Sequence, residues 1–121
     1  MRAKHVDKEW GWERWLANNE EENYCGKILH INGGETSSMH FHSEKHETFY
    51  VLEGDLKVVL IDTETTAQTI HILKPGETFV IDRLVPHQLS TATDNAVKII
   101  EISTLHKDED SFRVWKGKTG E

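Results

Sequence analysis

Three histidines and one glutamate carry the clearest chemical signal in this sequence. His40 and His42 stand two residues apart, and in a strand this spacing points both imidazoles to one face, about 7 Å apart along the chain. Glu47 follows at an odd offset, which a continuous strand would send to the opposite face, but the polar residues 43–46 can turn the chain back. His87 comes much later and must belong to another strand. We predict one metal site built from these four side chains.

The donor set defines the kind of metal. Three neutral imidazoles and a carboxylate suit Mn, Fe, Co, Ni or Zn, whereas Mg and Ca prefer oxygen ligands. Four protein ligands around an ion that accepts six leave two positions for water or substrate, which is typical of a catalytic site. In a chain with eight histidines, a lone His-x-His pair would more simply be two surface residues, so the surrounding pattern must decide.

Short strands are the elements that must position these ligands. From Cys25 onward, β-rich runs alternate with turn signals such as Gly33-Gly34, Glu53-Gly54 and Lys74-Pro75-Gly76. This rhythm predicts an all-β antiparallel sandwich or barrel, with strands at 27–31, 39–42, 47–52, 56–61, 69–73, 78–81 and 97–103.

The length of 121 residues suits one domain over 1–121. Residues 1–24 are rich in charge and tryptophan, and we expect them to form an N-terminal arm or short helix outside a barrel at 25–103. Residues 104–121 are a polar tail that could pack on the barrel or across a dimer. An aromatic arm is suited to cover an open sheet edge of a second copy, so we expect a homodimer.

Composition excludes several partners. The formal net charge of −7 and the lack of clustered Lys and Arg argue against nucleic acid. Neither an apolar run that could cross a bilayer nor a signal segment occurs, so we expect no membrane partner and a cytoplasmic location. The single cysteine excludes an intrachain disulfide.

The ligand segment resembles a known family. It matches the first motif of the cupin superfamily at every defining position, with the spacing Gly34-x5-His40-x-His42-x4-Glu47-x6-Gly54. Counting eleven residues from Gly76 in the second cupin motif reaches His87, although its proline, glycine and asparagine positions hold Asp82, Leu84 and Thr91. The resemblance covers about residues 25–103 and implies a cupin double-stranded β-helix, a jelly-roll-like barrel, with the metal inside.

Two shorter resemblances concern function. Residues 10–15, followed by residues 26–29 and by Gly34-x3-Ser38, look like the cupin domains of the phosphomannose isomerase group. Residues 40–47 are similar to the H-F-H-x-x-K-x-E segment of cupin D-lyxose isomerases, in which the embedded lysine acts in proton transfer. These resemblances imply a sugar or sugar phosphate as substrate and an aldose–ketose isomerase that acts through a metal-bound enediolate.

Lys45 and Glu101 are the candidate catalytic residues. A nearby cation would lower the pKa of Lys45 and make a neutral amine available, although a solvated turn lysine is an equal alternative. Glu101 shares strand parity with Val97 and Ile99, which predicts an inward carboxylate, but it could instead pair with Arg83.

Two other functions fit the same ligands. An iron-dependent dioxygenase of a small molecule needs the same open metal positions. A non-catalytic sugar-binding cupin also fits, because so short a chain has no room for large lids. The pocket should discriminate, since an isomerase needs polar acid–base groups and an oxygenase of an apolar substrate needs hydrophobic walls.

Overall fold

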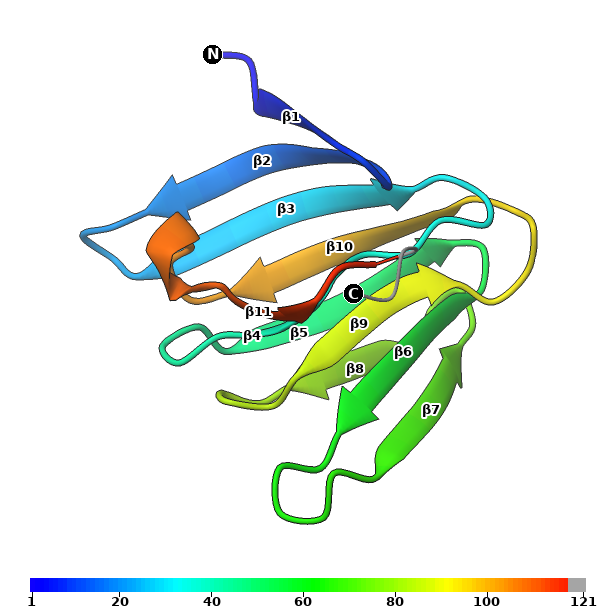
Figure 1. The fold of residues 1–121 in the computed structure, drawn as a ribbon. Helices are drawn as coiled ribbons and strands as arrows, with labels where there is room; N and C mark the ends of the chain where they lie inside the picture. The colour runs from blue at the N-terminus through cyan, green and yellow to red at the C-terminus, as the bar shows by residue number, and fades with distance from the viewer. Residues whose placement is uncertain (118–121) are drawn as a thin grey trace.

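Two antiparallel sheets face one another in the computed structural model, which describes residues 1–117 (Figure 1). The six-stranded sheet has the order β1-β2-β3-β10-β5-β8, and its strands are β1 (Lys4–Lys8), β2 (Gly11–Asn19), β3 (Tyr24–Ile31), β10 (Val97–Ser103), β5 (Glu47–Glu53) and β8 (Thr78–Ile81). The five-stranded sheet has the order β11-β4-β9-β6-β7, with β11 (Phe112–Trp115), β4 (Met39–Phe41), β9 (His87–Thr91), β6 (Leu56–Ile61) and β7 (Gln68–Leu73).

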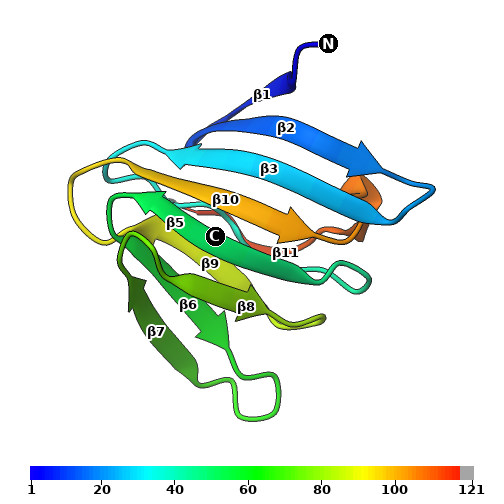
Figure 2. The same ribbon diagram turned by 180° about the vertical axis from the view of Figure 1, so that it is seen from behind.

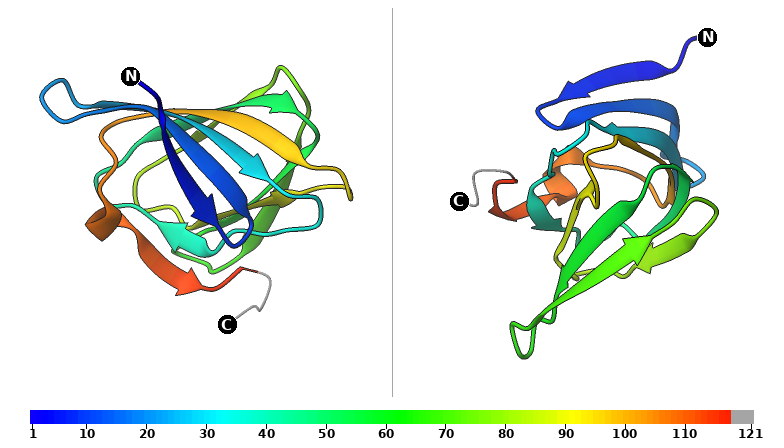
Figure 3. Two further views of the ribbon diagram at one scale, coloured as in Figure 1. Left: turned by 90° about the horizontal axis from the view of Figure 1, so that it is seen from above. Right: turned by 90° about the vertical axis from the view of Figure 1, so that its right-hand side faces the viewer.

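The sheets curve around a common interior, as the view from behind and the view from above show (Figures 2 and 3). One short 3-10 turn, η1 (Asp108–Asp110), precedes β11. This nearly all-β arrangement confirms the predicted fold class. Within residues 1–117, no helix is both long and apolar enough to span a bilayer.

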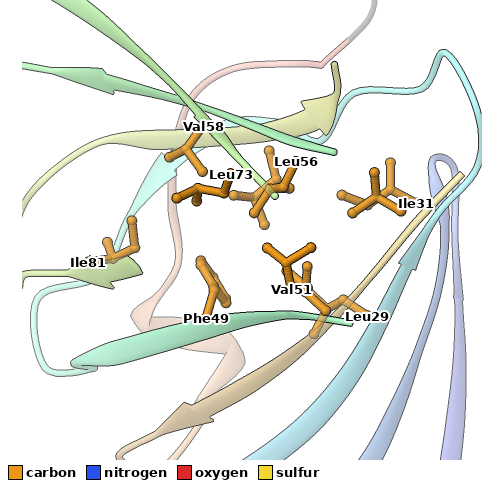
Figure 4. Packing of buried hydrophobic residues seen from close by; sticks show 11 residues of the cluster. Leu29, Ile31, Phe49, Val51, Leu56, Val58, Leu73 and Ile81 are labelled. Atoms are coloured by element: carbon orange, nitrogen blue, oxygen red, sulfur yellow. The ribbon is translucent and has the colours of Figure 1, made fainter. Parts of the chain in front are cut away.

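The interior has an apolar end and a polar end, and the inward rows of β3 and β10 pass from one to the other. On β10 the inward residues are Val97 and Ile99 at the apolar end and Glu101 and Ser103 at the polar end. On β3, which is antiparallel to β10, the apolar end holds Ile31 and Leu29 and the polar end holds Lys27. The apolar end is the core (Figure 4), which consists of Leu29, Ile31, Phe49, Val51, Leu56, Val58, Leu73, Ile81, Leu89, Val97 and Ile99. The polar end is where a site can form.

The N-terminal residues differ from the expectation. Residues 1–24 were predicted as an arm or short helix outside the barrel, but β1 and β2 extend the six-stranded sheet, and β2 pairs with β3 along its whole length. The alternation that makes β2 a strand is present, since Glu13 faces inward and Arg14 outward. Tryptophans and charges on both faces concealed it, because neither face of this strand is plainly apolar.

The seven predicted strand runs all occur, and the tail packs back on the barrel. β11 pairs with β4, and the ring of Phe112 stacks on that of Phe41 at 5.2 Å between centroids. The last four residues of the predicted tail, 118–121, lie outside the described residues.

The departure from the second cupin motif is accommodated at a backbone cost. Leu84 occupies the motif's glycine position and has a φ of 65°, in the left-handed region that L residues rarely adopt. Its N–H donates a hydrogen bond to the main-chain oxygen of His42 at 2.7 Å. The turn is therefore kept without glycine, and it ties the segment before His87 to the strand that carries the other histidines.

Candidate metal centre

Three strands bring the four predicted ligands together. β4 carries His40 and is followed by His42, β9 begins at His87, and His40 pairs directly with His87 in the antiparallel register. One donor atom from each of the three histidines lies within 4.8 Å of the others, a grouping that could hold a metal ion. Glu47 begins β5 on the opposite sheet, and its Oε2 lies 3.2 Å from Nε2 of His87 and 3.7 Å from Nε2 of His42. The turn at 43–46 therefore does return the carboxylate to the histidines.

Each imidazole is oriented by a hydrogen bond from its Nδ1 to a main-chain oxygen. The acceptors are Ser38 for His40 at 3.0 Å, Asp110 for His42 at 2.8 Å, and Val85 for His87 at 2.9 Å. Because Nδ1 is the donor, a neutral ring presents the lone pair of Nε2 to the site. Burial lowers the pKa of His40 well below its usual value and also lowers the pKa of His42, so these rings are held in the neutral form.

The carboxylate of Glu47 tests whether a cation fits here. Its Oε2 is buried and has no hydrogen-bond partner among residues 1–117, although buried polar atoms are nearly always paired. The nearest groups are the Nε2 atoms of His42 and His87. In the neutral rings, these atoms direct their own lone pairs at the negatively charged oxygen. A positive ion among these donors removes that conflict, and imidazole with carboxylate is a transition-metal donor set. The residues therefore fit one divalent metal.

Asp110 fixes the loop between the ligands. Its carboxylate accepts the N–H groups of Ser43, Glu44 and Lys45 at 2.8, 3.1 and 3.0 Å, and also the Ser43 hydroxyl at 2.8 Å. Burial acts to raise the pKa of Asp110, but these hydrogen bonds outweigh it and lower the pKa. The acidic run at 108–110 is, from the sequence alone, most simply a solvated turn. Asp110 is instead 3% exposed, and this role was missed.

Lys45 and Glu101 form a buried ion pair at 2.5 Å, with their charged ends on the site. Nζ of Lys45 also lies 3.6 Å from Oε1 of Glu47 and 3.0 Å from Nδ1 of His106. The Ser103 hydroxyl donates to Glu101 at 2.9 Å. Glu101 thus faces inward as its parity predicts and pairs with Lys45, while the alternative of a solvated Lys45 is wrong.

The two members of this pair shift each other's pKa. Burial acts to lower the pKa of Lys45, but the carboxylates of Glu101 and Glu47 outweigh it and raise the pKa. Burial acts to raise the pKa of Glu101, but Lys45 and then Lys27 lower it to about 2. These neighbours favour an ammonium and a carboxylate, whereas the expected lowering of the Lys45 pKa depends on a bound metal cation.

A cavity of about 500 Å³ opens from the ligands. Lys45 and Glu101 line it, and so do two residues that sequence reasoning missed, Lys27 on β3 and Glu13 on β2. Lys27 shares strand parity with the buried Leu29, and that parity could have identified it as an inward residue. The cavity wall therefore combines these charged groups with apolar side chains, which are Trp10, Leu29, Phe49 and Leu89.

Comparison with known proteins agrees with this geometry. Residues 27–103 match the family model of the cupin domain, so the chain belongs to the cupin domain family. Together with the histidine group, this membership indicates a divalent-metal site.

Among curated proteins, the chain is similar to 3-hydroxyanthranilate 3,4-dioxygenases. The identity to the Homo sapiens protein is 26% over 125 residues, covering 94% of this chain and 43% of that protein. The identity to the Rattus norvegicus protein is 29% over 93 residues, covering 77% and 32%. The chain therefore spans less than half the length of these relatives.

Solved structures show the same fold at low identity. The capsular polysaccharide assembling protein CapF from Staphylococcus aureus superposes with a TM-score of 0.84 at 14% identity, covering 95% of this chain and 33% of that one. Oxalate decarboxylase from Bacillus subtilis gives a TM-score of 0.80 at 16% identity, covering 93% and 30%. At these identities, the likeness concerns the fold alone.

Proposed function

We propose that this chain is a metal-dependent enzyme that moves a proton between neighbouring carbons of a small hydroxy-carbonyl compound, as an aldose–ketose isomerase of sugars or sugar phosphates does. The observation that carries the proposal is the Lys45–Glu101 ion pair, which lines the same cavity as the candidate metal ligands. A proton donor and a proton acceptor that lie side by side in the cavity suit proton transfer.

The mechanism follows from the charges of the pair. A divalent ion held by His40, His42, Glu47 and His87 would act as a Lewis acid toward a carbonyl or hydroxyl oxygen. The Glu101 carboxylate accepts the proton of the C–H bond beside the carbonyl, and the bond electrons move to the carbonyl oxygen. Lys45 donates a proton to that oxygen, which gives an enediol. Glu101 then returns its proton to the former carbonyl carbon, and the hydroxyl on the other carbon gives its proton to the Lys45 amine as it becomes the new carbonyl, so both residues regain their starting charges. Such positioned groups typically contribute about 10²- to 10⁴-fold.

Neighbouring groups keep the pair in place for this task. The Ser103 hydroxyl holds one oxygen of Glu101, and Nδ1 of His106 accepts a hydrogen bond from Lys45. The loop main chain at Lys45 is fixed by Asp110. The acid and the base are thus held in the absence of substrate, which reduces the ordering required when substrate binds.

Exchange of carbon-bound protons with solvent deuterium tests the proposal. Metal-loaded protein is incubated with a panel of aldoses, ketoses and their phosphates in D₂O and followed by NMR. We expect exchange at the carbon beside the carbonyl of at least one compound, and loss of exchange in E101Q and K45M. Binding without exchange on any compound would favour the non-catalytic sugar-binding cupin.

The dioxygenase is a second candidate, and it is favoured by the curated relatives, all five of which are 3-hydroxyanthranilate 3,4-dioxygenases. The matched probe is Fe(II)-loaded protein with 3-hydroxyanthranilate in an oxygen electrode. Metal-dependent oxygen uptake together with an absence of proton exchange on sugars would replace the isomerase proposal with this one.

We also propose a homodimer. Ile102, Val80 and Tyr50 are exposed apolar residues on the outer face of the six-stranded sheet, and the first two lie in one row, both paired with Thr48. Exposed apolar residues that lie side by side often mark an interaction surface. Light scattering should give about twice the chain mass of 14.0 kDa, and a monomer mass at micromolar concentration would contradict the proposal.

A further inference from the structure

Lys27 is a second buried ammonium in the cavity, and the proposed proton transfer does not use it. It stands on the inward row of β3, is 2% exposed, and lies opposite Glu101 in the register of β3 and β10. It lines the cavity together with the candidate ligands. Lysine is rarely buried unless its charge is paired, so its partners indicate what it is for.

The partners of Lys27 leave part of its donor capacity unused. An ammonium has three N–H donors. Among residues 1–117, the one hydrogen-bond partner of its Nζ is Oε1 of Glu13, at the long distance of 3.4 Å. That oxygen also accepts the indole N–H of Trp15 at 2.9 Å, and Nζ lies 4.3 Å from the centre of the Trp15 ring. At least one N–H of Lys27 is therefore available to a ligand in the cavity.

The charge balance of the cavity indicates the kind of ligand. Its buried charged groups are the carboxylates of Glu13, Glu47 and Glu101 and the ammonium groups of Lys27 and Lys45. Three negative charges against two positive charges leave one negative charge in excess. A divalent ion changes this to one positive charge in excess. The charges of the other residues that line the cavity cancel. The positive ones are Lys8, Arg113 and Lys116, and the negative ones are Asp7, Glu9 and Glu35. The loaded cavity thus matches a ligand with a single negative charge.

We propose that the substrate carries a carboxylate and that Lys27 donates an N–H to it. The inference rests on the proposed metal-dependent function and narrows its substrate to hydroxy-carbonyl compounds of the sugar-acid class. A phosphate monoester fits the balance less well, because it carries about −1.5 to −2 charges near neutral pH. A buried ammonium with a spare donor recognises a carboxylate strongly, since hydrogen bonds between charged partners exceed those between neutral ones.

Binding of matched small probes tests this assignment. Mn²⁺-loaded protein is titrated with glycolate, with its neutral counterpart glycolamide, and with methyl phosphate, and affinities are read from calorimetry and from Mn²⁺-induced broadening of the probe signals. We expect glycolate to bind at least about 10-fold more tightly than glycolamide, which is the effect of one charge-assisted hydrogen bond. K27M should remove this difference, while Mn²⁺ binds at least as tightly as to the parent protein, because a positive charge has been taken from the cavity. K98M, on the outer face of the same sheet, is the matched control and should behave as the parent.

A second variant separates contact from net charge and guards against misfolding. K27M alone leaves the buried carboxylate of Glu13 without its counter-charge, whereas E13Q/K27M removes both charges and restores the charge balance of the cavity. If Lys27 contacts the carboxylate, the double variant also loses the preference for glycolate. Recovery of the preference in the double variant, an unchanged preference in both variants, or tighter binding of methyl phosphate than of glycolate would overturn the inference.

The metal titration distinguishes this failure from a failure of the proposed function. If the parent protein does not bind Mn²⁺, the metal-dependent function itself is wrong, and the inference falls with it. If Mn²⁺ binds but glycolate and glycolamide bind equally, the inference alone is overturned.

Discussion

Nδ1 of His42 donates a hydrogen bond to the main-chain oxygen of Asp110 at 2.8 Å, across 68 positions of the chain. The side chain of the same aspartate holds the main chain of the loop at 43–45. One residue of the turn before β11 therefore orients a candidate metal ligand and also positions the loop that carries Lys45. The C-terminal segment up to residue 117 is in this way part of the site, although none of the four candidate ligands lies in it.

Removal of this carboxylate should weaken both stability and metal binding. In D110A, the buried N–H groups of the loop lose their acceptor, which costs about 1–3 kcal/mol of unfolding free energy. Loss of the support around His42 should lower metal affinity by about 10- to 100-fold. Urea unfolding and competition with a metal indicator measure the two effects. E109A changes the exposed neighbour and should alter neither, and an equal effect of the two variants would contradict the role of Asp110.

The metal should stabilise the fold through its four ligands. At a free metal concentration one hundred times the Kd, binding raises the unfolding free energy by about 2.7 kcal/mol. We expect a corresponding rise in melting temperature on loading with Zn²⁺ or Mn²⁺, and a reversal by chelator. H87A should lose the response and the bound metal found by elemental analysis, while H5A, on β1, should keep both. Full metal loading of H87A would show that His87 is not a ligand.

The buried Lys45–Glu101 pair should show strong coupling in a double-mutant cycle. K45M leaves two buried carboxylates without their counter-charge, and breaking a buried pair costs about 3–5 kcal/mol. The double variant K45M/E101M replaces the pair by apolar side chains, so it should be more stable than K45M. Urea unfolding of the parent, both single variants and the double variant gives the coupling energy. Additive effects of the two single changes would contradict a direct interaction.

The turn at Leu84 offers a stabilising change. A left-handed backbone costs an L residue about 1–2 kcal/mol, and glycine adopts it without that cost but loses more chain entropy on folding. L84G should therefore raise the unfolding free energy by up to about 1 kcal/mol, since the leucine side chain is largely exposed. L84A removes the same apolar surface but keeps Cβ, and it should not stabilise. A lower melting temperature of L84G than of L84A would show that the turn is not strained.

His106 should make stability dependent on pH. Burial, and then the positive charge of Lys45, lower the pKa of His106 below its usual value of 6.5. The unfolded chain therefore takes up this proton at higher pH than the folded chain. The His106 contribution to stability is complete well above pH 6.5 and is lost as pH falls through 6.5 toward the lower folded pKa, with a slope of at most about 1.4 kcal/mol per pH unit. Urea unfolding from pH 8 to pH 5 should show a shallower slope for H106N, and equal slopes would contradict the assignment.

The parts of the site that depend on spacing were predictable, and the parts that depend on distant contacts were not. The spacing of His40 and His42 gives them one face by strand geometry, and the polar turn at 43–46 together with the match to the first cupin motif predicts the return of Glu47. The inward direction of Glu101 follows from parity with Val97 and Ile99. No local pattern indicates that Asp110 reaches a loop more than sixty positions earlier, because its acidic neighbours make it look like any solvated turn.

Mixed faces explain the remaining differences. β2 carries Trp12 and Arg14 on one face and Glu13 on the other, so no apolar alternation marked it as a strand. Lysines usually lie on the surface, so Lys27 was not considered, although its parity with Leu29 already indicates that it faces inward. From the sequence, only the effect of a metal on the pKa of Lys45 could be considered. The pairing of Lys45 with Glu101 was not foreseen, because the two residues lie far apart in the sequence.

The division of the interior into an apolar half and a charged half has an evolutionary consequence. Residues that secure folding and residues that select a substrate occupy different stretches of the same strands, so substitutions in one half need not disturb the other. Replacement of Lys27, Glu13 or Glu101 by other polar residues during evolution can change the substrate, while the apolar half of the interior still stabilises the barrel. Adaptation in this chain is expected to proceed by changes of one or two inward side chains, without insertion of new segments.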